Sequence, residues 1–195
     1  MIRKLIRAAG ALILAAGILA LVTGFASRAE QGRAQAASFD TGLNSHWMTL
    51  KIAGQEVEVE ATRGGRKGMI EALYFENAVA TTREAGSGLA TGRRQYQPLL
   101  IRKRIDKSSP LLMKALTQNQ PVEASFNFYR PSLFGDSPEE LFYTVQIRNA
   151  RVNSVKIVQE SGSEPVEEVT FVFHTITWTY TNGGVTHEDT WDQQR

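Results

Sequence analysis

The sequence predicts a mainly β protein, a compact β-barrel of about eight strands flanked by one α-helix and carrying a long protruding loop. From residue 46 onward, several segments alternate apolar and polar residues with the period of two that suits half-buried strands. One well-delimited helical pattern spans residues 105–116. Residues 80–97 contain three glycines and no sustained apolar period, which is typical of a long loop with a function.

The first 36 residues have the pattern of a membrane-targeting segment. A basic head at residues 1–7 precedes an uncharged apolar run at 8–26, longer than an ordinary signal-peptide core and close to the length that crosses a bilayer. Residues 1–36 are therefore predicted to be either a signal peptide cleaved before Ala37 or an inner-membrane anchor through residues 8–26. An overextended start, with the true first residue as far downstream as Met48, is a third reading. Residues 37–45 are interpreted as a linker and 46–195 as the barrel domain.

Charge and composition limit the classes of function. Without the leader the chain has 17 Lys and Arg against 19 Asp and Glu, a net charge of −2. Such a balance argues against a nucleic-acid partner, so the basic run Arg102, Lys103 and Arg104 is interpreted as a solvated strand end. The chain has no cysteine, which excludes disulfides and thiolate metal sites.

Strand patterns and turn residues give the order of the elements. In the first strand, Val57, Val59 and Ala61 alternate with glutamates. The last two strands form the strongest predicted hairpin, because the Asn-Gly-Gly sequence at 182–184 supplies the positive φ that a tight turn requires. The predicted strands are 57–61, 69–79, 98–104, 122–129, 141–147, 152–158, 169–180 and 185–191.

The helix is predicted from its start signal, its apolar stripe and its stop signal. Ser109 is expected to cap a free amide of the first turn, with Pro110 at the first helical position. Asn119 and Pro121 are expected to end the helix. The face toward the sheet is predicted to hold Leu111, Leu112, Ala115 and Leu116.

No convergent set of catalytic residues is evident. The three histidines, at positions 46, 174 and 187, do not have metal-ligand spacing. The residues of the sequence His187-Glu188-Asp189 lie next to each other on a strand, so they alternate between faces and cannot converge on one atom. No catalytic, metal or cofactor site is predicted. Three aromatic residues near the C-terminus, Trp178, Tyr180 and Trp191, are interpreted as core or barrel-edge packing.

Three motifs in order resemble those of a known family. They are the sequence SGLATGRRQ at 87–95, the segment 105–112, and ITWTY at 176–180 followed by GVTHEDTW at 184–191. Over about 48–191 the chain resembles Hcp, the haemolysin-coregulated tube protein family of bacterial type VI secretion. The family fold is a compact β-barrel with one helix and a long protruding loop.

The resemblance implies a structural role without catalysis. Subunits of this family form hexameric rings that stack into a hollow tube, which a contracting sheath expels with a spike at its tip and with effectors in its lumen. Carried over by position, the loop residues Thr91, Gly92, Arg93, Arg94 and Gln95 would contact the next ring. Similarly, Asp106, Lys107, Ser108, Ser109 and Pro110 would lie near a subunit junction. On this hypothesis Arg94→Glu weakens stacking and spares the monomer fold.

The leader departs from the family, whose subunits usually lack one and assemble in the cytoplasm. With a genuine leader the protein would be periplasmic or attached to the inner membrane. With an overextended start it would be cytoplasmic before assembly and secreted through type VI secretion. The alternative function is a membrane-tethered or periplasmic β-barrel binding module that does not form rings. A secreted enzyme on this fold is the least favoured reading.

Overall fold

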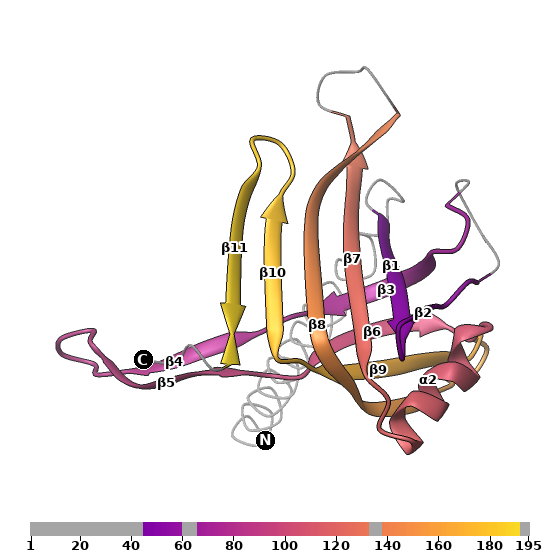
Figure 1. The fold of residues 1–195 in the computed structure, drawn as a ribbon, viewed down its shortest axis with the longest axis horizontal. Helices are drawn as coiled ribbons and strands as arrows, with labels where there is room; N and C mark the ends of the chain where they lie inside the picture. Colours follow the sequence, from indigo (N-terminus) through magenta and orange to yellow (C-terminus); the bar gives the residue numbers. More distant parts are fainter. Residues whose placement is uncertain (1–44, 60–65, 133–137, 192–195) are drawn as a thin grey trace, which may run out of the picture. The chain divides into compact units, whose positions relative to one another are not determined.

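A computed structural model describes the fold of residues 45–59, 66–132 and 138–191 (Figure 1). These residues belong to one of the two units into which the chain divides, Asn44–Arg195. The predicted leader, 1–36, and the predicted linker up to residue 44 lie outside the described residues, and both stay predictions. Within the described ranges, no helix combines the length and the apolar character needed to cross a membrane.

Six antiparallel strands close a barrel, which confirms the predicted fold class. The order is β8-β7-β1-β3-β6-β9, and β9 returns to pair with β8. Closure depends on the length of β8, whose residues 139–150 pair with β7 and whose residues 151–158 pair with β9. The six strands are β1 (Ser45–Ile52), β3 (Ile70–Glu76), β6 (Leu99–Arg104), β7 (Val122–Pro131), β8 (Glu139–Val158) and β9 (Val166–Val172).

A hairpin of β10 (Thr175–Tyr180) and β11 (Val185–Thr190) extends the sheet from the first half of β8 (Figure 1). The hairpin was predicted, although Gly183 and Gly184 supply the positive φ, and Asn182 does not. The predicted strand 169–180 is two strands: β9 pairs with residues 151–158 of β8 and with β6, whereas β10 pairs with residues 143–148 of β8. Conversely, the two strands predicted over 141–158 are the single strand β8.

The first predicted strand, 57–61, is wrong. The chain forms β1 earlier, and β2 (Gln55–Glu56) is a two-residue return that pairs with its end. Val57 and Val59 follow β2 outside any strand, yet both are buried, and Ala61 lies outside the described residues. The alternation of valine and glutamate therefore predicted correctly that the valines are buried, but it did not predict that they lie outside a strand.

The barrel interior is filled by the inward residues of every wall strand. Phe126 of β7 lies 5.0 Å from Phe75 of β3 and 6.3 Å from Phe171 of β9, measured between ring centroids. These contacts join strands that are not neighbours in the sheet, so apolar burial stabilises the closed form. The fully buried apolar core residues include Met48, Ile70, Leu99, Ile101, Leu112, Val122, Phe126, Ile147, Val169 and Phe171.

The helix α2 (Ser108–Thr117) packs against β8, and its start differs from the prediction. Leu112 and Ala115 are buried, whereas Leu111 is 40% exposed and does not widen the core face as expected. Ser109 is not the cap and Pro110 is the third helical residue, because the helix begins at Ser108. The Asp106 carboxylate accepts the Ser108 amide at 2.8 Å instead.

The end of α2 agrees with the prediction. The Gln118 amide donates to the Lys114 carbonyl at 2.9 Å, and Asn119 adopts a φ of +50°. This left-handed residue turns the chain out of the helix just before Pro121. The chain then enters β7 at Val122.

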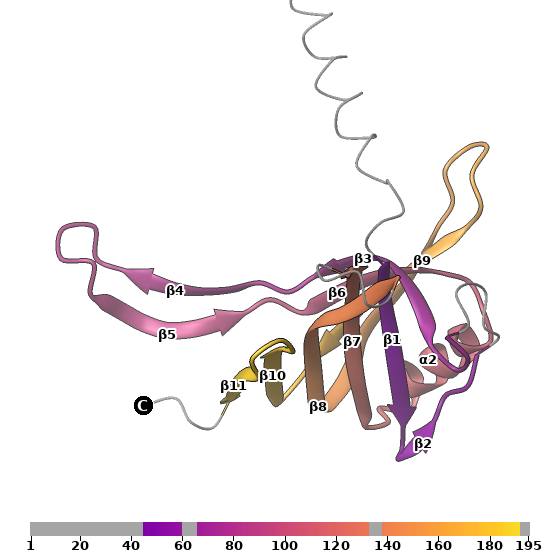
Figure 2. The ribbon, with the colours of Figure 1, turned by 90° about the horizontal axis from the view of Figure 1, so that it is seen from above.

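The segment predicted as a structureless loop is a β-hairpin. Strands β4 (Val79–Arg83) and β5 (Ala90–Tyr96) form their own two-stranded sheet, which runs away from the barrel (Figure 2). The prediction that this segment protrudes is thus confirmed, and the prediction that it lacks regular structure is wrong. Residues 82–93 are all exposed, so the hairpin forms without a core of its own.

Candidate functional site

The strand β5 presents two different faces. Arg93 and Gln95 are exposed, whereas Arg94 and Tyr96 are half-buried. Successive side chains of a strand point to opposite sides, which explains the alternation. The half-buried side faces β11, and the exposed side meets solvent.

Asp189 of β11 binds both half-buried residues of β5. Arg94 donates from Nε and Nη2 to the two carboxylate oxygens of Asp189, and Tyr96 donates its hydroxyl to the same carboxylate. Arg94 Nη2 also donates to the Thr190 carbonyl at 2.9 Å. A two-pronged guanidinium–carboxylate pair fixes orientation as well as distance. This set of contacts ties the base of the β4–β5 hairpin to the β10–β11 hairpin.

The environment of Asp189 favours its charged form. Burial acts to raise the pKa of Asp189, but hydrogen bonds from Tyr96 and Arg94, with the positive charge of Arg94, outweigh it and hold the pKa below its usual value. Burial, followed by the hydrogen bond to Asp189, raises the pKa of Tyr96 to about 12. At neutral pH the carboxylate is therefore an acceptor and the phenol a donor, as the contacts require.

An aromatic cluster supports the same junction. The Tyr96 ring lies 5.4 Å from Phe173, 6.4 Å from Trp178 and 6.1 Å from Trp191 between centroids. Trp178 Nε1 donates to Asn77 Oδ1 at 3.2 Å, which joins β10 to the residue just after β3. Trp178 thus packs at the barrel edge, as predicted, whereas Trp191 contacts Tyr96 but is 47% exposed, and Tyr180 is 38% exposed.

The far end of the hairpin is ordered only by local contacts. The Glu84 amide donates to the Leu89 carbonyl and the Gly88 amide to the Glu84 carbonyl, each at 2.9 Å. Gly88 has a φ of +69°, which favours glycine at this turn. Leu89 is 68% exposed, so this tip offers an apolar side chain together with the nearby Arg93.

The second predicted contact segment, 106–110, uses most of its polar groups within the chain. Ser108 is buried, and its hydroxyl donates to Asp106 at 2.5 Å. Ser109 donates to Glu167 at 2.8 Å. Lys107 and Pro110 are exposed. A junction role for this segment stays a prediction.

The basic run 102–104 is not simply a solvated strand end, because Lys103 is fully buried. Its Nζ donates to Glu167 at 2.7 Å, Asp106 at 2.9 Å and the Arg104 carbonyl at 2.7 Å. The ammonium group joins β6, β9 and the start of α2. Sequence analysis misread it because strand periodicity points Lys103 inward, while its charge suggested solvent.

The polar residues of β11 diverge as the alternation predicted. Glu188 binds Arg148 at 2.6 Å, while the His187 ring stacks on Trp178 with centroids 5.7 Å apart. Asp189 is occupied by Arg94 and Tyr96, so the three residues have separate partners. Among the described residues, no group of three histidine or acidic side chains is placed to hold a metal ion.

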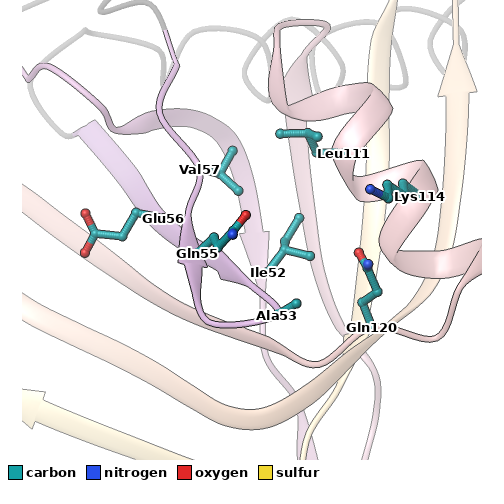
Figure 3. Close-up of a pocket in the computed structure, with 8 residues that line it drawn as sticks. All are labelled: Ile52, Ala53, Gln55, Glu56, Val57, Leu111, Lys114 and Gln120. Carbon is teal, nitrogen blue, oxygen red and sulfur yellow. The ribbon is translucent and has the colours of Figure 1, made fainter.

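Two cavities lie near the end of β1. The smaller, of about 120 Å³, is lined by Ile52 and Val57 on one side and by Leu111 and Lys114 of α2 on the other (Figure 3). The larger, of about 570 Å³, has charged residues such as Glu58 in its lining. Ligand sites are mostly apolar, with a few placed polar groups, and usually measure about 300 to 1,000 Å³. The smaller cavity is below that size, and the lining of the larger cavity is too charged.

The geometry defines a class of protein: an antiparallel barrel that presents an exposed β-hairpin held at its base by Asp189. Residues 49–180 match the family described as "Type VI secretion system effector, Hcp". The curated "Major exported protein" of Pseudomonas aeruginosa is 30% identical over 159 residues, covering 77% of this chain and 91% of the relative. This chain therefore belongs to the Hcp family of the type VI secretion system.

Solved structures agree with that assignment. The Hcp1 protein from E. coli EAEC 042 matches with a TM-score of 0.67 and 30% identity, over 75% of this chain and 98% of that one. The secreted protein Hcp3 from Pseudomonas aeruginosa has the same fold, with a TM-score of 0.64 and 23% identity over 76% and 98% of the two chains. The resemblance inferred from the three motifs is confirmed.

Sequence reasoning found the protruding segment as a loop, and found neither its pairing as a hairpin nor its anchor. Arg94 was expected to contact the next ring, but its guanidinium already binds Asp189 of the same chain. The two residues are 95 positions apart, and no local pattern pairs them. Contact of 91–95 with a second copy stays a prediction, now resting on the exposed Arg93 and Gln95.

Proposed function

We propose that this chain is a tube subunit of a type VI secretion system, in which six copies form a ring and the rings stack into a hollow tube. The observation that carries the proposal is the β4–β5 hairpin, which is fixed at its base and exposed along residues 82–93. A hairpin without a core is costly to present unless another surface covers it. A subunit of the next ring would cover it.

The open edge of the sheet supports association within a ring. In the part of the chain that the structure describes, β11 pairs only with β10, so its other edge has no strand partner, although Arg94 binds the Thr190 carbonyl at one end. Such edges bind other strands readily. A head-to-tail contact that closes after six copies produces a ring, and it uses two different surfaces of each subunit.

The proposal includes the partners of the tube. The sheath would enclose it, the spike would cap it and effectors would occupy its lumen, while the chain itself performs no catalysis. Expulsion would place the protein outside the cell, as the name "Major exported protein" says of its relative. Sequencing the N-terminus of the protein from separated cell fractions would show whether residues 1–36 are removed, retained or never made.

Mass measurement tests the ring. Light scattering on the purified protein is expected to give about six times the mass of one chain, and electron microscopy is expected to show hollow rings. A mass of one chain at high concentration would contradict the proposal. That result would favour the alternative, a binding module that does not form rings.

A further inference from the structure

The direction of the β4–β5 hairpin has to be set by contacts outside it. Its two strands pair only with each other among the described residues. Two-stranded hairpins are marginally stable alone in water. The only buried or half-buried positions of β5 are those near its end, Arg94 and Tyr96. The anchoring contacts therefore lie at the base.

The acceptor of these contacts is itself firmly placed. Asp189 pairs in register with Ile176 of β10, and Ile176 pairs with Ile147 of β8. Both isoleucines are buried core residues. Asp189 thus ends a cross-strand row that begins in the barrel core, and its position is fixed by the barrel.

We propose that Asp189 is a latch that sets the direction of the β4–β5 hairpin before any second copy binds. Arg94 and Tyr96 hold the hairpin from one face of β5, and Arg93 and Gln95 on the other face meet the next ring. The division rests on the proposed stacking function. Asp189, Arg94 and Tyr96 are positioning residues, since their polar groups are already used within the chain.

A latch of this kind serves assembly because a preformed contact surface loses less conformational freedom on binding. In a stack, each subunit uses the same contact, so an error in hairpin direction recurs at every ring. The two-pronged Arg94–Asp189 pair suits this task, since it restrains angle as well as distance. A single hydrogen bond would leave the hairpin free to swing.

The test separates the latch from stacking by measuring each on its own. Hydrogen exchange of residues 79–96 is measured on purified, unstacked protein, and tube length is measured by electron microscopy under stacking conditions. Asp189→Asn is expected to speed hairpin exchange about tenfold and to shorten the tubes. Arg93→Gln is expected to shorten the tubes and leave hairpin exchange unchanged.

Glu188→Gln is the matched control, because Glu188 also binds an arginine but on the opposite face of β11. It is expected to leave hairpin exchange unchanged. Arg94→Lys keeps the charge without the two-pronged geometry and is expected to give an intermediate exchange rate. Unchanged hydrogen exchange in the barrel strands of each variant confirms that the barrel still folds. If the barrel of Asp189→Asn does not fold, the hairpin exchange rate of Arg94→Lys tests the proposal instead.

The outcomes separate the two proposals. Unchanged hairpin exchange in Asp189→Asn overturns the latch whatever the tubes do. Faster exchange with tubes of normal length overturns the claim that hairpin direction governs stacking. If the wild-type protein never stacks while Asp189→Asn still frees the hairpin, the tube function fails and the latch itself stands.

Discussion

At the scale of single residues, the hairpin junction depends on a carboxylate with three donated hydrogen bonds. Each bond comes from β5, so the charge of Asp189 is compensated by the element that it positions. Hydrogen bonds to a charged acceptor contribute more than neutral ones, and an unpaired buried acceptor is costly. Removing either donor, Arg94 or Tyr96, is therefore expected to destabilise the charged carboxylate of Asp189.

Tyr96→Phe removes one donor and keeps the aromatic packing. We expect a loss of about 1 to 2 kcal/mol in the free energy of unfolding, because the phenol donates to a charged carboxylate. Urea unfolding followed by circular dichroism measures the change. Tyr74→Phe is the control, since Tyr74 hydrogen bonds to Glu76 at the surface, and its effect on the free energy of unfolding is expected to be clearly smaller. Equal effects in the two variants would contradict the role given to Tyr96.

The pKa of Asp189 predicts an acid-sensitive junction. Its pKa in the folded protein is lower than the value of about 3.9 in an unfolded chain, so the stabilisation is present above that value. It is lost as the pH falls through the lower, folded pKa. Unfolding free energies at pH 7 and pH 3 should therefore differ more for the wild type than for Asp189→Asn. If the unfolding free energies of the wild type and of Asp189→Asn fall equally between pH 7 and pH 3, the acid sensitivity does not come from Asp189.

At the scale of elements, the buried cluster around Lys103 determines how α2 begins. Lys103 lies on β6, Glu167 on β9, and Asp106 in the connection to α2. The ammonium bonds require these three elements to meet at one point. Buried ion pairs contribute little net stability when intact, but breaking one is strongly destabilising.

Lys103→Met is expected to destabilise the fold by about 3 to 5 kcal/mol, because it leaves the carboxylate of Glu167 buried without a counter-charge. The double variant Lys103→Met with Glu167→Leu is expected to recover most of that loss. Denaturant unfolding of the two single variants and the double variant measures the coupling. Additive effects in the double variant would show that the two groups do not interact.

At the scale of the whole described unit, the barrel holds the core and the hairpin tip does not, so the proposed tube function assigns stability and assembly to separate parts. The barrel closes where β9 pairs with both β6 and β8, and Phe171 is fully buried at that closure. The hairpin tip contributes no core. Changes in the barrel should therefore affect folding, and changes at the tip should affect assembly.

Phe171→Ala is expected to cost about 3 to 5 kcal/mol of unfolding free energy, through lost burial and a cavity in the barrel. Leu89→Ala, at the exposed tip, is expected to change it by less than about 0.5 kcal/mol. Thermal unfolding of both variants makes the comparison. A large effect of Leu89→Ala would mean that the tip packs on its own barrel.

Local patterns in the sequence were enough to predict the mainly β fold, the wall strands β3, β6 and β7, the last hairpin, the end of α2 and the protruding segment. They succeed because strand alternation, positive-φ turns and helix stop signals depend on neighbours a few residues apart. The same patterns failed where a residue is buried without belonging to a strand. Val57 and Val59 are examples.

Only the tertiary structure decided that β8 is continuous, that residues 80–97 pair as a hairpin, and that Arg94 binds Asp189 within the chain. It also decided that Lys103 is buried. Strand closure and the pairing of distant charges depend on which residues the fold brings together across long stretches of chain. Local patterns were sufficient for the family, the fold class and the single helix, and long-range contacts determined what holds the hairpin.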